Sequence, residues 1–168
     1  MQFQFSHHYA MSPEDFWGKL FFDRAFNDAL YLEGLGFETV SVESETTGPD
    51  GDRDRVLKVT PRLAMPGPVK KLMGDRFSYH EHGHFDAARR AHTARIVLSR
   101  LADKVKIAHT MWLEPDASGG STRKVTADVE VSIFGVGRVF EKFAEKSVRE
   151  SYEKAAAFTN AWWAKHHG

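Results

Sequence analysis

The chain has 168 residues, of which 42% are hydrophobic and 27% charged, a composition typical of one folded domain rather than a disordered chain. Lys and Arg together number 23, as do Asp and Glu, so no net charge draws the protein to nucleic acid, and we expect no nucleic-acid partner. The absence of cysteine excludes disulfides, a thiolate nucleophile and a cysteine-ligated zinc site.

Two further absences concern location. The chain does not open on a basic region followed by an apolar core, and it contains no run of about 18 apolar residues. Neither a signal peptide nor a membrane span is therefore predicted. Because the lack of cysteine also favours a reducing compartment, we expect a cytoplasmic protein.

The N-terminal part predicts a strand followed by two short helices. Residues 2–10 alternate weakly in hydrophobicity, as a strand does. Residues 12–15, Ser-Pro-Glu-Asp, have the order of an N-cap, a proline at the first helical position and acids in the first turn, so a helix should begin there. A second helix over 24–33 should end at Gly34 and Gly36.

From residue 37 the hydrophobic period changes to two, which predicts a meander of antiparallel strands. The last strand alternates most clearly. Its odd-numbered residues from Val125 to Ile133 are apolar, and its even-numbered residues from Lys124 to Ser132 are polar, so one face is dry and the other wet. The predicted strands cover 37–46, 53–60, 76–85, 92–101, 105–114 and 123–134.

A long helix is predicted at the C-terminal end. After Gly135 and Gly137, apolar residues recur at steps of three and four over 138–165, which corresponds to roughly 40 Å of helix. No other element is long enough to cover the dry face of the sheet. We therefore predict an α+β fold in a single domain spanning 1–168, with a curved antiparallel sheet wrapped around the C-terminal helix and two short helices after the first strand.

This order of elements, with Ser-Pro-Glu-Asp-Phe-Trp opening the first helix, resembles the START-like (SRPBCC) superfamily, whose fold is called the helix grip. Phe77-x-Tyr79-x-Glu81 and the run from Val131 to Gly137 look like an uncharacterised bacterial START-like family. The likeness covers nearly the whole chain. It implies a hydrophobic cavity between sheet and helix, closed by loops, that holds a lipid, a sterol or a polyketide-like molecule.

Three histidines, His80, His82 and His84, share one face of a predicted strand, with neighbouring side chains about 7 Å apart. A zinc or nickel site would need a bend in the strand or a third ligand there. Tyr79 and Phe85 have the opposite parity and suit the core, which places the histidines on the wet face. We therefore expect no metal site and no bound cofactor.

Two titratable residues point by parity toward the dry face. His109 shares its parity with Ile107 and Met111, so it is either a hydrogen-bonded core residue or a polar group inside a cavity. Glu81 is a carboxylate on the dry face, which is costly unless it is paired. Arg95 on the following strand is the predicted partner, either in a structural ion pair or as part of an anchor for a ligand head group.

Small residues on the terminal helix indicate where space could remain. Ala144, Ser147, Ser151 and Ala155 lie near its apolar stripe, and they suit either a cavity or close packing against the sheet. The predicted ligand-binding residues are Tyr79, Glu81, Arg95, His109, Met111, Phe143, Ser147 and Tyr152.

The segment 61–74 contains three prolines and predicts a structured loop with one helical turn after Pro68. Between Leu63 and Met73 it mixes apolar residues with two lysines. Two interpretations stay open: the segment caps the core, or it is a lid that makes transient contact with a membrane surface.

Known catalytic signatures are missing from the sequence. It has no glycine-rich phosphate loop, no His-Glu-x-x-His helix and no Gly-x-Ser-x-Gly elbow. Binding of a hydrophobic small molecule, as a carrier or sensor, is therefore the first hypothesis, with no catalytic residues assigned. The alternatives are a polyketide cyclase or aromatase-like enzyme that uses the same cavity, and a protein-interaction module without a cavity.

Overall fold

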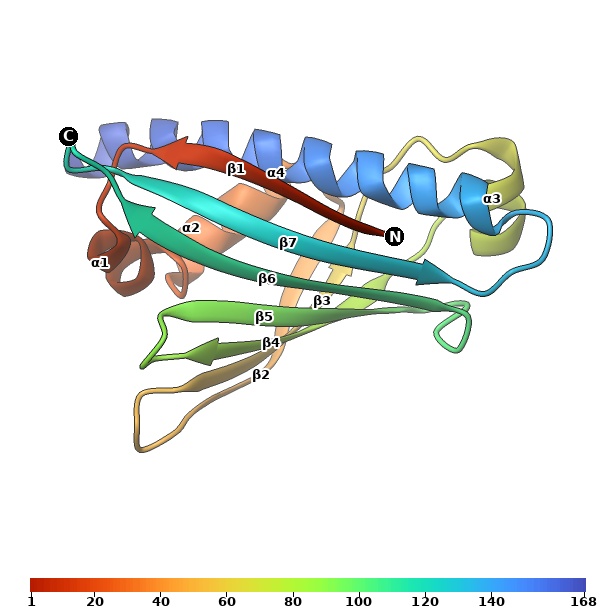
Figure 1. Ribbon diagram of the computed structural model, residues 1–168, viewed down its shortest axis with the longest axis horizontal. Coiled ribbons are helices and arrows are strands. Elements are labelled where there is room, and N and C mark those ends of the chain that lie inside the picture. Colours follow the sequence, from red (N-terminus) through yellow and green to blue (C-terminus); the bar gives the residue numbers. More distant parts are fainter.

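The computed structural model, which describes residues 1–168, contains one seven-stranded antiparallel sheet with the strand order β1-β7-β6-β5-β4-β3-β2. The sheet curves around helix α4, which runs along it, while α1 and α2 lie near one end of α4 and α3 near the other (Figure 1). The strands are β1 Gln2–Tyr9, β2 Thr39–Thr47, β3 Arg53–Thr60, β4 Tyr79–Asp86, β5 Ala91–Leu98, β6 Val105–Pro115 and β7 Ser121–Val131. The helical elements are α1 Pro13–Asp15, η1 Phe16–Leu20, α2 Arg24–Ala29, η2 Leu30–Gly34, α3 Gly67–Met73 and α4 Gly137–His167. The predicted α+β helix-grip fold is confirmed.

The two helices after β1 begin at side-chain caps. The Ser12 hydroxyl accepts a hydrogen bond from the backbone N–H of Asp15 at 3.1 Å, and the Asp23 carboxylate accepts one from Phe26 at 2.8 Å. Each helix then continues as a π-helical turn, η1 after α1 and η2 after α2. In η1 the N–H of Phe21 donates to the carbonyl of Phe16 at 2.9 Å. The predicted helix starts are confirmed, and the wider turns are an additional feature.

Strand faces follow the predicted alternation. On β7, Val125, Ala127 and Val129 are at most 1% exposed and face α4. On β4, Glu81 and Phe85 point inward and His82 and His84 point to solvent. On β4 and β7 the dry and wet faces are therefore those that the sequence predicts.

The end of β7 differs from the prediction. The strand was expected to reach residue 134, but it ends at Val131, and the Phe134 side chain is fully exposed. Ser132 donates its N–H to the carbonyl of Lys104 at 2.8 Å, and Gly135 then takes a φ of 79° that turns the chain into α4. The alternation of apolar and polar residues in the sequence therefore continues beyond Val131, the last residue of the strand.

Two hydrophobic clusters hold α4 against the sheet. The first, here called the α2 cluster, is built from η1, α2 and the adjoining ends of the strands, and the second, the α3 cluster, lies at the other end of the sheet. Buried members of the α2 cluster are Tyr9, Met11, Phe16, Trp17, Leu20, Phe26, Phe85, Met111, Leu113, Val125 and Ala156. Buried members of the α3 cluster are Phe3, Val69, Met73, Phe77, Leu98, Val105, Ala127, Val129, Phe140 and Ala144.

The proline-rich segment before β4 closes the α3 cluster. Val69 and Met73 on α3 are at most 1% exposed, and Leu63 packs against the same cluster. Lys70 and Lys71 point to solvent. This arrangement supports the interpretation of the segment as a cap on the core. None of the helices combines the length and the apolar composition that a membrane crossing requires.

Gly83 on β4 is predicted to be intolerant of a side chain. A Cβ there would lie 2.4 Å from Nε2 of His92, whose ring is 2% exposed and packs against Phe21. Gly83→Ala should therefore lower the free energy of unfolding by about 1–3 kcal/mol, measured by urea denaturation. Gly18→Ala is the matched control, because nothing lies within 4 Å of its added methyl group, and it should be neutral or stabilising. Equal effects of the two substitutions would contradict the prediction.

Candidate functional site

An internal cavity of about 220 Å³ lies between the sheet and α4. A single water molecule needs roughly 10–15 Å³ of such space, so this cavity is large enough for an organic molecule. Of the 33 residues that line it, 23 are hydrophobic. The walls come from β3 to β7, from the helices after β1 and from the inner face of α4.

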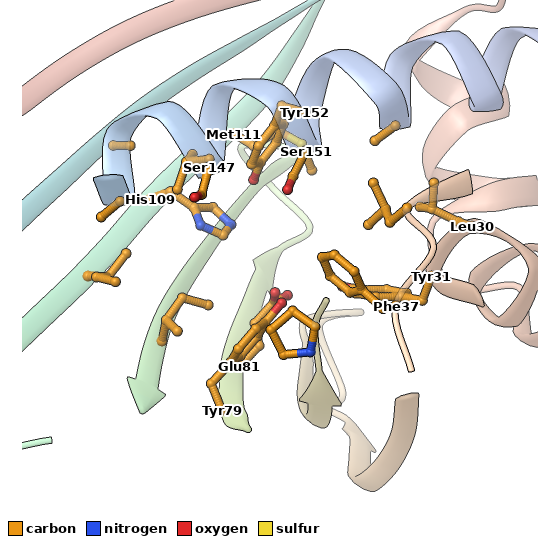
Figure 2. A pocket seen from close by; sticks show the side chains of 18 of the residues that line it. Leu30, Tyr31, Phe37, Tyr79, Glu81, His109, Met111, Ser147, Ser151 and Tyr152 are labelled. Carbon is orange, nitrogen blue, oxygen red and sulfur yellow. The ribbon is translucent and has the colours of Figure 1, made fainter. Parts of the chain in front are cut away.

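Small side chains on α4 explain why the space stays open. Ala144, Ser147, Ser151 and Ala155 all face the cavity, while the larger Phe143 and Tyr152 stand beside them. Figure 2 shows Ser147, Ser151 and Tyr152 projecting from the helix toward Glu81 on the opposite wall. Of the two interpretations of these small residues, the structure favours the cavity.

The structure places seven of the eight predicted ligand-binding residues on the cavity wall. They are Tyr79, Glu81, His109, Met111, Phe143, Ser147 and Tyr152. Arg95 is exposed on the outer face of β5, so the predicted pair between Glu81 and Arg95 is wrong. The strand partner of Glu81 is Ile96, which faces inward. The inward parity of β5 is that of Ala94, Ile96 and Leu98, and this apolar alternation is visible in the sequence.

Arg55 on β3 is the arginine that the prediction missed. It is 6% exposed and lines the cavity, and its Nη1 donates to the backbone carbonyl of Phe21 at 3.1 Å. Its guanidinium also lies 5.1 Å and 5.2 Å from the ring centres of Phe21 and Phe22. Arg55 shares its parity with the buried Leu57, which is the sequence signal that could have located it.

Glu81 is a carboxyl group deep inside the protein with no bonded partner. Burial raises its pKa above the usual value, and the positive charge of Arg55 opposes part of that increase. No hydrogen bond and no ion pair within the protein holds its carboxylate, which points into the cavity in Figure 2. Its side chain is partly accessible only because the cavity surface adjoins it.

His109 on β6 also lines the cavity and is neutral at physiological pH. Burial lowers its pKa to about 4, and the charge of Arg123 adds to this effect. Its ring meets the ring of Tyr152 edge to face at 5.7 Å and lies 6.0 Å from that of His92. Burial likewise holds the pKa of His92 well below its usual range.

Arg123 ties β7 to α4 next to the cavity. It is 3% exposed, and its Nη2 donates to the backbone carbonyl of Tyr152 at 2.7 Å. The guanidinium also lies 4.9 Å from the ring centre of Tyr9 and 4.6 Å from that of Tyr152. Nη2 also lies 3.2 Å from Nδ1 of His7, while Nε is buried without a hydrogen-bond partner.

The site has polar groups but no metal-binding geometry. No group of three or more His, Asp or Glu side chains is arranged to hold a metal ion. His84 instead contacts Asp54 through Nδ1 at 2.8 Å on the outer surface. The cavity chemistry is thus that of one carboxyl group, neutral imidazoles, hydroxyl groups and two engaged guanidinium groups.

The curved sheet, the helix that it grips and the cavity between them define the helix-grip fold. The family is identified by sequence. The model of a family described as protein of unknown function (DUF2505) matches residues 4–163, so the chain belongs to that family. No curated protein sequence matches the chain.

Solved structures with the same fold are distant in sequence. Norcoclaurine synthase from Thalictrum flavum, in complex with dopamine and hydroxybenzaldehyde, is 15% identical with a TM-score of 0.68 over 100% of this chain and 88% of that one. The Zhui aromatase/cyclase from Streptomyces sp. R1128 is 12% identical with a TM-score of 0.65 over 95% and 93%. Ginseng major latex-like protein 151 from Panax ginseng is 9% identical with a TM-score of 0.59 over 96% and 95%. These likenesses confirm the fold.

The histidines inside and outside the sheet should affect acid stability in opposite directions. The folded-state pKa of His109 lies below its unfolded value of about 6.5, so acidification from there toward pH 4 protonates the unfolded chain first and lowers the free energy of unfolding. The hydrogen bond to Asp54 raises the pKa of His84, which therefore stabilises the fold below that pKa.

His109→Gln should consequently reduce the loss of stability between pH 7.5 and pH 5, and His84→Gln should increase it slightly, in urea denaturation at each pH. His84 is 47% exposed, so its effect is the smaller one. Identical pH profiles for the two variants would contradict the assignment of opposite shifts.

Proposed function

We propose that this protein binds a hydrophobic small molecule, as a carrier or sensor, in the cavity between the sheet and α4. The observation that carries the proposal is the cavity itself, which is of ligand size and has mainly hydrophobic walls with a few polar groups. The alternative of an interaction module required a fully packed interior, and this interior is not fully packed.

The energetic cost of the cavity supports a bound state. The side chains around the cavity volume of about 220 Å³ lack packing partners on that side, which lowers the stability of the folded protein. A molecule that fills the space recovers much of this free energy, so binding and folding stability are linked.

The named structural neighbours are compatible with this proposal. One was solved with dopamine and hydroxybenzaldehyde, and another is an aromatase/cyclase. A lipid or sterol as the ligand is our proposal from the superfamily resemblance. The cytoplasmic location and a transient membrane contact through Leu63 to Met73 likewise stay predictions.

A cyclase-like enzyme is the second candidate, favoured by one observation. Glu81 and His109 both face the cavity, and burial shifts the pKa of each in the direction of its neutral form. No hydrogen bond joins these two groups, and no nucleophile is paired with a base in the cavity. The binding function is therefore the primary proposal.

Native mass spectrometry of freshly purified protein, followed by organic extraction, tests the proposal. A stoichiometric hydrophobic compound is the expected result, and its identity gives the ligand class. A ligand-free mass that persists after incubation with mixed lipids and with aromatic polyketides would contradict a binding function.

Filling the cavity should weaken binding without unfolding the protein. Ser147→Phe places a ring in the space beside Phe143, so the affinity for the fluorescent probe N-phenyl-1-naphthylamine should fall about tenfold or more. Lys154→Phe adds the same ring on the exposed side of α4 and should leave probe binding unchanged. Unchanged binding in Ser147→Phe would place the ligand elsewhere.

A further inference from the structure

Several polar groups converge on the middle of the cavity without partners in the protein. They are the carboxylate of Glu81 on β4 and the hydroxyl groups of Ser147, Ser151 and Tyr152 on α4 (Figure 2). None of these side chains forms a hydrogen bond to another protein group. All four side chains are partly accessible and line the cavity, so a molecule bound there can supply the hydrogen bonds that the protein does not.

The neighbouring cations are already engaged. Arg55 and Arg123 each donate to a backbone carbonyl, of Phe21 and of Tyr152 respectively, and each lies over aromatic rings. They are 6% and 3% exposed, so little of either guanidinium faces the cavity. Glu81 is therefore the charged group that a ligand meets.

The chemistry of Glu81 restricts the polar part of the ligand. When Glu81 is ionised, which the charge of Arg55 favours, it accepts hydrogen bonds and repels a carboxylate or phosphate on the ligand. When it is neutral, which burial favours, it has no charge to attract a cationic ligand. An ammonium group would be attracted, but it must lose its hydration in a cavity with mainly apolar walls. A hydroxyl group satisfies the carboxylate at a much lower cost of desolvation.

We propose that the ligand is an uncharged hydrophobic alcohol or phenol whose hydroxyl group donates a hydrogen bond to Glu81. This proposal rests on the proposed binding function and gives it a ligand class. The hydroxyl oxygen is then available as an acceptor for the hydroxyl groups of Ser147 and Ser151 on the facing helix. The hydrophobic body of the ligand lies against the apolar walls, which include Leu30, Phe37, Ile96, Ile107 and Phe143.

Four compounds of matched shape test the proposal: 4-butylphenol, 4-butylbenzoate, 4-butylbenzylamine and butylbenzene. Their displacement of N-phenyl-1-naphthylamine is measured at pH 8, where the phenol is uncharged. We expect 4-butylphenol to bind about tenfold or more tightly than the other three compounds. It alone can donate a hydrogen bond to the Glu81 carboxyl group without first losing the hydration of a charged group.

Variants of Glu81 assign the selectivity to this residue. Glu81→Leu should remove the preference for the phenol over butylbenzene, and Glu81→Gln should reduce the discrimination against the benzoate. Glu43→Gln removes an exposed carboxylate and is the matched control with unchanged selectivity. Glu81→Leu should also raise the thermal midpoint by about 2–4 °C, because it removes an unpaired buried carboxyl group, whereas loss of a structural ion-pair partner would lower it.

The outcomes distinguish a failure of the proposed binding function from a failure of the proposed ligand class. If the probe and all four compounds fail to bind, as judged also by calorimetry, the binding function itself is wrong. If they bind but the benzoate or the amine equals or exceeds the phenol, the function stands and the hydroxyl ligand class is overturned. The same holds if the selectivity of the wild type persists in Glu81→Leu.

Discussion

Helix α4 is held to the sheet by two separate hydrophobic clusters, and the rest of the structure depends on this division. The α3 cluster fixes Phe140 and Ala144 near the start of the helix, and the α2 cluster fixes Ala156 farther along. Between these contacts Ser147, Ser151 and Ala155 face the cavity and are short, while the ring of Tyr152 contacts His109 on β6. The separation of helix and sheet is thus set at the two ends, and the middle cannot collapse without disrupting both clusters.

The same geometry explains how charged groups are tolerated inside. Arg123 and Arg55 each lie at the edge of the cavity and use a backbone carbonyl and aromatic rings as partners. Glu81 has no such partner and instead depends on the cavity for its contacts. A carboxyl group without a partner in the folded chain lowers its stability, and this carboxyl group lies on the cavity wall where a ligand can reach it.

Much of the fold was predictable because one face of every long strand is dry and a single helix is long enough to cover it. Parity also placed Tyr79, Glu81 and His109 on the cavity wall. It failed for Arg95, whose neighbour Val97 is apolar although it lies on the outer side of β5. The single apolar residue Val97 does not define the buried face of β5, whereas the three apolar residues of the opposite parity, Ala94, Ile96 and Leu98, do.

Other features of the structure cannot be predicted from the spacing of apolar residues in the sequence. The turns η1 and η2 differ from α-helix by one residue per hydrogen-bonded ring, which leaves the apolar pattern almost unchanged. Which arginine lies near Glu81, Arg95 on the following strand in the prediction or Arg55 on β3 in the structure, depends on strand order as well as on parity. The size of the cavity depends on how closely two clusters hold a helix, and no local sequence pattern measures that distance.

The strand order also has a consequence for how the chain is made. β1 is hydrogen-bonded only to β7, and β7 is followed directly by α4 (Figure 1). β1 must therefore wait for β7 to be synthesised before it can pair, and the aromatic residues of η1 and α2 wait for the helix that covers them. Such distant pairings slow folding and prolong the exposure of apolar surface.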